Sequence, residues 1–224
     1  LTLRPVIVAF GVVAFPLILQ PNLGTTLVLG AITFTVLFSS GVPLAPLAGW
    51  GLVGAAGALF ASMAESYRRR RVLAFLDPWA DRLNTGYQII QSQVSLASGG
   101  LLGVGLGASR AKWGFLPYAH TDFIFAIIGE EIGIVGASLV VGLFAALAYL
   151  GVRTAVRAPD RFGQLLAVGI TAWLCVQAFV NIGAVIGVLP ITGVPLPFVS
   201  YGGSSLVATM AAAGILLNVC RQAR

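Results

Sequence analysis

A histidine and three carboxylates lie beside one of the most apolar runs of the chain, in the stretch LPYAHTDFIFAIIGEE, residues 116–131. The whole sequence has only seven acidic residues, and ionisable groups at membrane depth are costly, so they are functional candidates. Asp122 is the best of them: partial burial raises a carboxylate's pKa and nearby arginines lower it, a balance that suits a general base. The alternative is that Asp122 only caps the next helix. For Glu130 and Glu131 we favour structural pairing with arginine.

Metal and thiol chemistry have little support in the sequence. No HExxH, CxxC or paired histidine spacing is present, so we do not expect a metal cage made by protein groups alone. The sequence requires no cofactor, but it leaves open a Mg²⁺ or Mn²⁺ ion held by Asp122 and a substrate pyrophosphate. Cys175 and Cys220 lie in apolar helical segments, where cysteine usually serves as a small hydrophobic side chain.

Four consecutive arginines stand in the segment ESYRRRRVLAFLDPWADR, residues 65–82. Its apolar residues recur at helical spacing, and Pro78 ends the pattern, so we expect an amphipathic helix lying at the membrane interface. The arginines then have two compatible roles. They anchor the helix on anionic lipid, or they bind a phosphate-bearing substrate, for which Arg68 and Arg71 are the candidates.

The segment QIIQSQVS, residues 88–95, places polar uncharged side chains at helical spacing. One face would then carry uncharged polar groups that suit hydrogen bonds to sugar hydroxyls and amides, from Gln88, Gln91, Ser92 and Ser95. The alternative is the water-facing side of a re-entrant helix. The glycine-rich run that follows, GGLLGVGLGAS, has no preceding strand and no βαβ unit around it, so we reject nucleotide binding.

The elements that position these residues are membrane helices. The chain has 224 residues, 58% of them hydrophobic and 9% charged, with a mean hydropathy of +0.97, which indicates an integral membrane protein. We predict an all-α helix bundle in three parts: three transmembrane helices in 1–63, a long extracytoplasmic loop carrying the active site in 64–125, and three more helices in 126–224. The expected spans are about 5–19, 24–41, 46–63, 126–152, 163–188 and 203–219. The abrupt apolar start suggests an N-terminal truncation.

The basic residues of the short loops predict the orientation. With six spans, Arg4, Arg153, Arg157, Arg161 and the C-terminal arginines fall on one side, which should be the cytoplasm. The long loop, the QPN turn near residue 21 and the connection before the last helix then lie outside. The net charge of +6 is better explained by anionic lipid headgroups than by nucleic acid, because the arginines lie at span ends and in one loop.

Several motifs together resemble the SEDS family of bacterial cell-wall proteins: QPNLGTTLVL, YRRRRVLAFLDPWAD, GYQIIQSQ, GLGASRAKWGFLPYAHTDFIFAIIGEE and LPITGVPLPFVSYGGSSLVATMAAAGILLNVCR. The resemblance covers nearly the whole chain. The phrases FLDPWAD and TGVPLPFVSYGGSS are more similar to the cell-division members, FtsW, than to the elongation members, RodA.

The resemblance implies a ten-helix fold, of which this chain would be the last six helices. It implies a peptidoglycan glycosyltransferase of the bacterial cytoplasmic membrane, acting at the division septum, that polymerises lipid II outside and works with a class B penicillin-binding protein and other divisome proteins. Asp122 matches the family's essential aspartate. The matching motifs add predicted substrate contacts at Ser109, Lys112, His120, Thr121, Ser200 and Tyr201. The chain departs from the family at Tyr118 and Asn22, where Glu and Asp are usual, so position 118 cannot supply a required acid or base here.

The implied reaction needs one base and positive charge. Asp122 would take a proton from the sugar hydroxyl that attacks the anomeric carbon of another lipid-linked sugar, and arginine, lysine or Mg²⁺ would stabilise the departing undecaprenyl pyrophosphate, with inversion at that carbon. Two other functions stay open. A lipid flippase would need polar residues within several spans, where Gln177 and Asn181 are nearly the only ones. A non-catalytic divisome scaffold would leave Asp122 unexplained.

Overall fold

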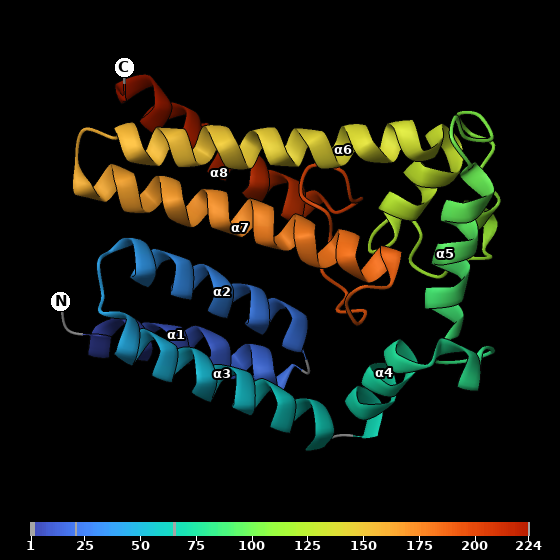
Figure 1. The fold of residues 1–224 in the computed structure, drawn as a ribbon, viewed down its shortest axis with the longest axis horizontal. Helices are drawn as coiled ribbons and strands as arrows, with labels where there is room; N and C mark the ends of the chain where they lie inside the picture. The colour runs from blue at the N-terminus through green and yellow to red at the C-terminus, as the bar shows by residue number, and fades with distance from the viewer. Residues whose placement is uncertain (1–2, 21, 65, 224) are drawn as a thin grey trace.

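The computed structural model describes residues 3–20, 22–64 and 66–223, and within these ranges the chain forms helices joined by loops, with no strand (Figure 1). The α-helices are α1 (Leu3–Leu19), α2 (Leu23–Ser39), α3 (Leu44–Ala64), α4 (Ser66–Leu76), α5 (Tyr87–Gly99), α6 (Ile124–Arg157), α7 (Arg161–Ile186) and α8 (Gly203–Gln222). Two short 3₁₀ helices, η1 (Pro78–Asp81) and η2 (Ala111–Trp113), lie in the long connection between α3 and α6. The predicted all-α class is confirmed.

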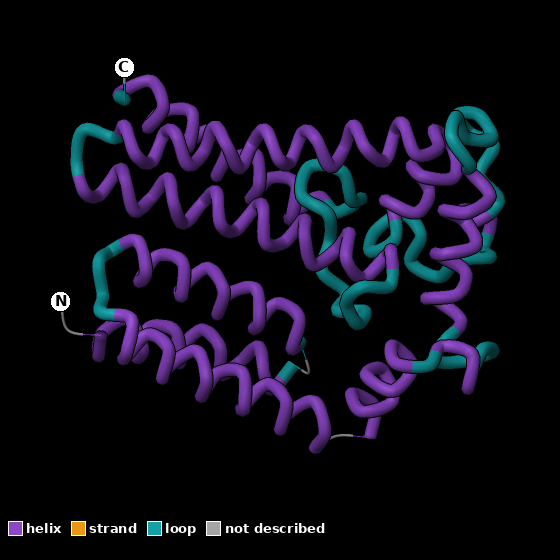
Figure 2. The backbone as a smooth tube through the Cα atoms, in the orientation of Figure 1, coloured by secondary structure: helices purple, strands orange, loops and turns teal. Residues whose placement is uncertain are grey.

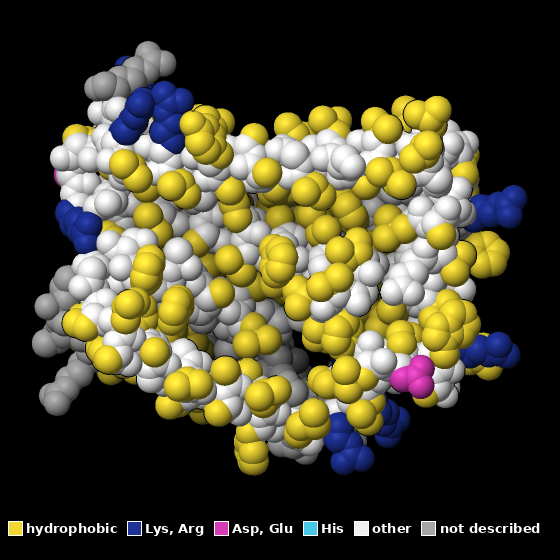
Figure 3. Space-filling view, viewed as in Figure 1, with side chains coloured by type: hydrophobic (Ala, Val, Ile, Leu, Met, Phe, Trp, Pro, Cys, Tyr) yellow, Lys and Arg dark blue, Asp and Glu magenta, His cyan; other side chains and the backbone are white. Residues whose placement is uncertain are grey.

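All six predicted spans are helical, and their lengths fall into two groups. α6, α7 and α8 are long and apolar enough to cross a membrane, whereas the apolar helical stretches Pro5–Leu19, Gly24–Ser39 and Leu44–Phe60 are shorter. Large hydrophobic side chains are exposed along the helices, as expected for surfaces that face lipid, and lysine and arginine gather at the two ends of the molecule (Figure 3).

α7 lies at the centre of the bundle and packs against α2, α5, α6 and α8, while α1 and α3 flank α2 (Figure 1). Short turns join α2 to α3 and α6 to α7 at one end of the bundle. The long connection before α6 and the connection between α7 and α8 meet at the other end (Figure 2). Segments far apart in the sequence therefore form one surface there.

α6 is broken at Gly133, a feature that the sequence did not predict. Gly133 has φ 72° and ψ −164°, a backbone conformation that only glycine adopts readily, and a Cβ there would lie 2.5 Å from backbone atoms of Leu101 and Gly103. The groups freed by the break bond to the loop that follows α5. The four bonds run from Val104 N to Glu130 O (2.9 Å), Gly105 N to Glu131 O (3.1 Å), Ile134 N to Gly100 O (3.0 Å) and Val135 N to Leu101 O (3.3 Å).

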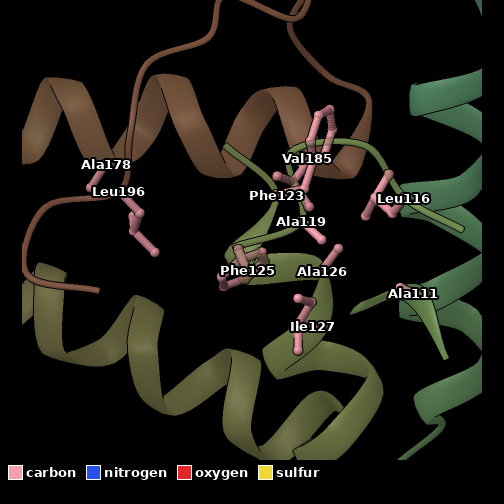
Figure 4. Close-up of a cluster of buried hydrophobic side chains, with 10 residues drawn as sticks. All are labelled: Ala111, Leu116, Ala119, Phe123, Phe125, Ala126, Ile127, Ala178, Val185 and Leu196. Atoms are coloured by element: carbon pink, nitrogen blue, oxygen red, sulfur yellow. The ribbon is translucent and has the colours of Figure 1, made fainter. Parts of the chain in front are cut away.

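An apolar cluster holds the segment before α6 in place. Its members come from the end of the long connection, the first turns of α6, α7 and the connection that follows α7: Ala111, Leu116, Ala119, Phe123, Phe125, Ala126, Ile127, Ala178, Val185 and Leu196 (Figure 4). Phe123, directly after Asp122, is 1% exposed. Burying a side chain of this size contributes about 1.5–3 kcal/mol, so the position of Asp122 is fixed by the cluster on one side of it.

Candidate functional site

The site is built on the backbone of residues 120–122, whose three consecutive carbonyls each accept a hydrogen bond from α7 or from the connection after it. Because the donors come from segments that lie 59 to 81 positions along the chain, the segment is held by tertiary contacts and not by its own turn. The three bonds run from Tyr201 N to His120 O (2.9 Å), Ser200 Oγ to Thr121 O (2.6 Å) and Asn181 Nδ2 to Asp122 O (2.8 Å).

The carboxylate of Asp122 is half-buried, with Thr121 and Arg71 among its neighbours. Burial raises its pKa above the ordinary value, while the polar side chain of Thr121 and the positive charge of Arg71 oppose that rise. A Cβ at Gly193 would lie 3.6 Å from Oδ2, so the carboxylate lies against the α7–α8 connection. Phe123 is the N-cap of α6, and no side chain caps that helix, so the alternative of a capping role for Asp122 is wrong.

Arg71, on the basic helix α4, lies near Asp122. Its side chain lines a cavity of about 290 Å³ with Gln88 of α5, Tyr118 and Ile191. α4 ends at Leu76, and Asp77 then caps η1 by accepting a hydrogen bond from Trp79 N (3.1 Å), which confirms the predicted end of the amphipathic helix before Pro78. The structure thus brings together Arg71, Gln88 and Asp122 from three separate stretches of the long connection. The side chain of Arg68 lies outside the described residues.

The polar stripe of α5 does not face one surface. Gln88 reaches the cavity and Gln91 is half-buried, but Ser92 is fully buried, and its hydroxyl lies within hydrogen-bonding distance of the carbonyls of Ile89 (2.9 Å) and Val185 (3.0 Å). Its hydroxyl bonds α5 to α7 and is not available to a sugar. The prediction that Ser92 contacts substrate therefore lacks geometric support, because helix packing uses its only donor.

Ser109 and Lys112 likewise bond to the protein. Ser109 is fully buried, and its hydroxyl donates to Glu130 (2.5 Å), whose carboxylate also accepts from the N–H groups of Arg110 (3.0 Å) and Ala111 (3.3 Å). Lys112 donates to Glu131 (2.9 Å) and to the carbonyl of Gly107. Both glutamates are bonded within the protein, as the predicted structural role requires. Within the described residues, however, the partners are a serine, a lysine and backbone N–H groups, where we expected arginine.

The remaining predicted contacts surround the bonded carbonyls. His120 and Tyr201 have exposed side chains, and the Thr121 hydroxyl donates to the carbonyl of Tyr118 (3.2 Å). Ser200 is buried, and besides donating to Thr121 it accepts from Leu196 N (2.7 Å), so its single proton is used within the protein. His120, Thr121 and Tyr201 are therefore the members of this set that lie at the surface of the site.

Asn181 is the residue that sequence reasoning did not place in the site. It was visible as an amide in an otherwise apolar span, which is the signal for a functional or structural hydrogen bond. Its Nδ2 donates to Val194 O (2.8 Å) as well as to Asp122 O. Gln177, one turn earlier on α7, donates to Pro195 O (2.9 Å). Both amides hold the α7–α8 connection, and only Asn181 also holds the backbone of Asp122.

A divalent cation would find few protein ligands here. Within the described residues no group of three His, Cys, Asp or Glu side chains could hold a metal ion. Glu130 and Glu131 are bonded to Ser109 and to Lys112 of η2, which leaves Asp122, near Arg71, as the candidate protein ligand of an ion. This donor set fits an ion that takes most of its oxygen ligands from a bound phosphate and water, as Mg²⁺ commonly does.

The fold and this site define a polytopic helical membrane protein with a half-buried carboxylate and a basic helix at one end of its bundle. The sequence profile of the cell cycle protein family FtsW/RodA/SpoVE matches residues 2–224. The chain belongs to this family, whose members are the SEDS proteins, and the predicted resemblance is confirmed.

Relatives and solved structures agree with this assignment. The chain is 46% identical over 215 residues to "Probable peptidoglycan glycosyltransferase FtsW" of Geobacter metallireducens, covering 96% of this chain and 57% of that protein. It is 44% identical over 224 residues to "Stage V sporulation protein E" of Bacillus subtilis, covering 99% and 61%. The chain therefore spans about three fifths of the length of these relatives.

Two solved structures have the same fold. One is described as "Structural coordination of polymerization and crosslinking by a peptidoglycan synthase complex" and matches with a TM-score of 0.78 at 34% identity, covering 97% of this chain and 61% of that one. The other is the rod shape determining protein RodA of Thermus thermophilus, with a TM-score of 0.66 at 30% identity, covering 97% and 56%.

Proposed function

We propose that the full-length protein is a peptidoglycan glycosyltransferase that polymerises lipid II at the outer face of the cytoplasmic membrane during cell division. The observation that carries the proposal is the half-buried Asp122 carboxylate, which has a raised pKa and lies within electrostatic reach of Arg71. A base and a cation are what the transfer of a pyrophosphate-linked sugar needs. The names of the FtsW relatives support the same activity.

Asp122 acts as the general base. Its carboxylate takes the proton of the acceptor sugar hydroxyl as that oxygen attacks the anomeric carbon, and the bond from that carbon to the lipid pyrophosphate breaks with inversion. A pKa raised by burial makes the carboxylate a stronger proton acceptor than an exposed aspartate. One carboxylate is enough, because the leaving pyrophosphate is a good anion and needs no protonation by a second acid.

Arg71 stabilises the departing pyrophosphate from the cavity that it lines with Gln88. A guanidinium can donate two parallel hydrogen bonds to phosphate oxygens, and Gln88 can donate to a sugar oxygen or an amide. A Mg²⁺ ion, if bound at Asp122, would supply further positive charge to the same oxygens.

An apolar cavity could hold the lipid part of the substrate. A cavity of about 590 Å³ lies between α2 and α7 and reaches the connection that holds Asp122, with walls that are almost entirely apolar. Its size is within the usual range for ligand pockets, and an apolar groove beside a polar site suits a sugar carried on a lipid. A class B penicillin-binding protein is the proposed partner, which the match to a complex for polymerization and crosslinking supports.

A transport function has less support. Gln177 and Asn181, the two amides in the second half of α7, donate to backbone carbonyls of the α7–α8 connection and of residue 122. Side chains bonded in this way hold a loop and do not line a polar path across the bundle.

The test is polymerisation of lipid II by the full-length protein with its partner, comparing Asp122→Asn with the unsubstituted protein. A general base contributes about 10²–10⁴-fold, so we expect the variant to lose nearly all polymer formation while it still inserts and still binds its partner. Asp160→Asn is the matched control. Asp160 caps α7 at the opposite end by accepting from Gly163 N (3.1 Å), and Asn caps about as well as Asp. An Asp122→Asn variant with more than about a tenth of the activity would remove Asp122 from the catalytic role.

A further inference from the structure

A third cavity lies between the C-terminal halves of α6 and α8, at the end of the bundle opposite Asp122. Its volume is about 360 Å³, and its apolar walls include Leu147 and Leu150 of α6 and Leu216 and Leu217 of α8. Arg153 and Arg157 of α6 belong to the same lining. The cavity exists because both helices pack closely on α7. Gly151 of α6 lies directly against Thr171, and Leu216 packs in the α7–α8 core, which leaves the space between α6 and α8 open.

The two arginines form a positive pair on one face of α6. They are four positions apart, so their side chains are neighbours on the helix surface, and both are exposed. Among the described residues neither guanidinium has a hydrogen-bond or ion-pair partner. Asp160, the acidic residue nearest to them in sequence, accepts from Gly163 N at the start of α7 and does not line the cavity.

The positive charge exceeds the negative charge of the helix ends. α6 and α8 both end near this cavity, and each helix C-terminus carries about −0.5 of an elementary charge, or about −1 together. Arg153 and Arg157 contribute +2. The opening of the cavity is therefore electropositive, and a bare helix end could not hold an anion there without them.

The chemistry of the cavity matches a molecule that has a phosphate at one end and a hydrocarbon chain at the other. Paired guanidiniums bind phosphate oxygens with several charge-assisted hydrogen bonds, and leucine side chains contact an acyl chain. Free phosphate or a nucleotide would leave the leucine walls uncovered. The walls belong to helices long and apolar enough to span a membrane, so an acyl chain of a membrane lipid can reach them.

We propose that this cavity, the α6–α8 groove, binds one anionic glycerophospholipid, with its phosphate on Arg153 and Arg157 and one acyl chain against Leu147, Leu150, Leu216 and Leu217. A transmembrane helix of a partner fits less well. An apolar membrane helix brings no anionic group to Arg153 and Arg157, which line the groove with exposed side chains. The site is separate from Asp122 and does not depend on the proposed enzymatic function.

The experiment measures lipid retained by the full-length protein purified in mild detergent and supplied with dioleoyl phosphatidylglycerol, using native mass spectrometry. Two arms replace that lipid, one with zwitterionic dioleoyl phosphatidylcholine and one with inorganic phosphate. We expect one retained phosphatidylglycerol molecule. The variant Arg153→Gln/Arg157→Gln should bind it about tenfold or more weakly, the loss expected when charge-assisted hydrogen bonds are removed.

Two further variants make the result specific. Arg161→Gln/Arg221→Gln removes the same charge from the same end of the bundle without touching the groove, and it should retain the lipid. Leu217→Trp keeps both arginines but fills the groove, and it should weaken binding. Thermal unfolding of each variant checks that it is folded. If Arg153→Gln/Arg157→Gln is unfolded, Leu217→Trp alone decides.

Four results would overturn the proposal. Equal weakening in the two double variants would mean that only general surface charge attracts the lipid. Equal retention of phosphatidylcholine would mean that the arginines do not select a headgroup. Binding of inorganic phosphate as tight as that of phosphatidylglycerol would exclude a role for the leucine walls. Cross-linking of a partner's transmembrane helix to position 217 in cells would make that helix the occupant.

Discussion

Asn181 ties Asp122 to a membrane helix: its Nδ2 donates 2.8 Å hydrogen bonds to the carbonyl of Asp122 and to the carbonyl of Val194. Asn181 is 2% exposed, and its Oδ1 has no partner in the described part of the chain. A single amide on α7 thus joins the segment before α6 to the connection before α8. The position of the Asp122 carboxylate depends on a residue that does not itself face the site.

We expect Asn181→Leu to lower kcat for lipid II polymerisation more than it changes KM, and to alter the pH profile. The substitution removes the donor from the buried bond to Val194 O, at a cost of about 1–3 kcal/mol, and from the part-buried bond to Asp122 O, which frees the backbone of Asp122. Gln177→Leu is the control, since it breaks a similar bond, to Pro195, without touching residue 122. Both variants should lose thermal stability. Equal pH profiles for Asn181→Leu and the unsubstituted protein would show that Asn181 does not position Asp122.

Asp122→Asn should raise the thermal unfolding midpoint at pH 7.5. Burial raises the pKa of Asp122, so the folded protein binds this proton more tightly than the unfolded chain, whose aspartates have a pKa of about 3.9. The resulting stability is complete below the unfolded pKa and is lost as the pH rises through the folded pKa. Asn is neutral throughout and avoids that loss. The difference in midpoint should therefore close as the pH is lowered toward 4, as measured by unfolding scans over a pH series. A variant less stable than the unsubstituted protein at pH 7.5 would contradict the raised pKa.

Gly133→Ala should destabilise the protein by about 1–3 kcal/mol through the backbone conformation alone, because φ 72° with ψ −164° is open essentially to glycine only. A Cβ there also meets Leu101 and Gly103 at 2.5 Å, so the loss should be larger still. Gly142→Ala on the same helix is the control. A Cβ at Gly142 has nothing within 4 Å, and alanine should stabilise a helix by about 0.5–1 kcal/mol relative to glycine. Thermal unfolding in one detergent compares them, and equal effects would mean that α6 is not broken at this point.

Single cysteines should report which end of the bundle faces outward. In a background without Cys175 and Cys220, Arg82→Cys should react with a membrane-impermeant maleimide in intact cells, and Pro159→Cys should react only after the membrane is opened. Both positions are exposed, in the long connection and in the α6–α7 turn. The basic residues near Pro159 are the reason to place that turn inside. The reverse labelling would move the Asp122 end of the bundle to the cytoplasm and would exclude polymerisation at the outer face.

The sequence by itself determined the helices and the acidic candidate. Runs of apolar residues long enough to cross a bilayer form helices there, because all backbone groups must bond within the segment. The end of α4 before Pro78 and the importance of Asp122 beside an apolar run followed from local chemistry in the same way. The family motifs were equally local.

Only the tertiary structure decided which polar side chains meet. Ser92 and Ser109 have the spacing and chemistry of surface residues, but α7 and Glu130 take up their hydroxyls in the interior. The break at Gly133 and the bonds to the carbonyls of residues 120–122 require donors from loops far away in the sequence. Helical periodicity reports neighbours three or four positions apart, whereas the environment of Asp122 is set by contacts up to about 80 positions away, and those form only when the helices pack.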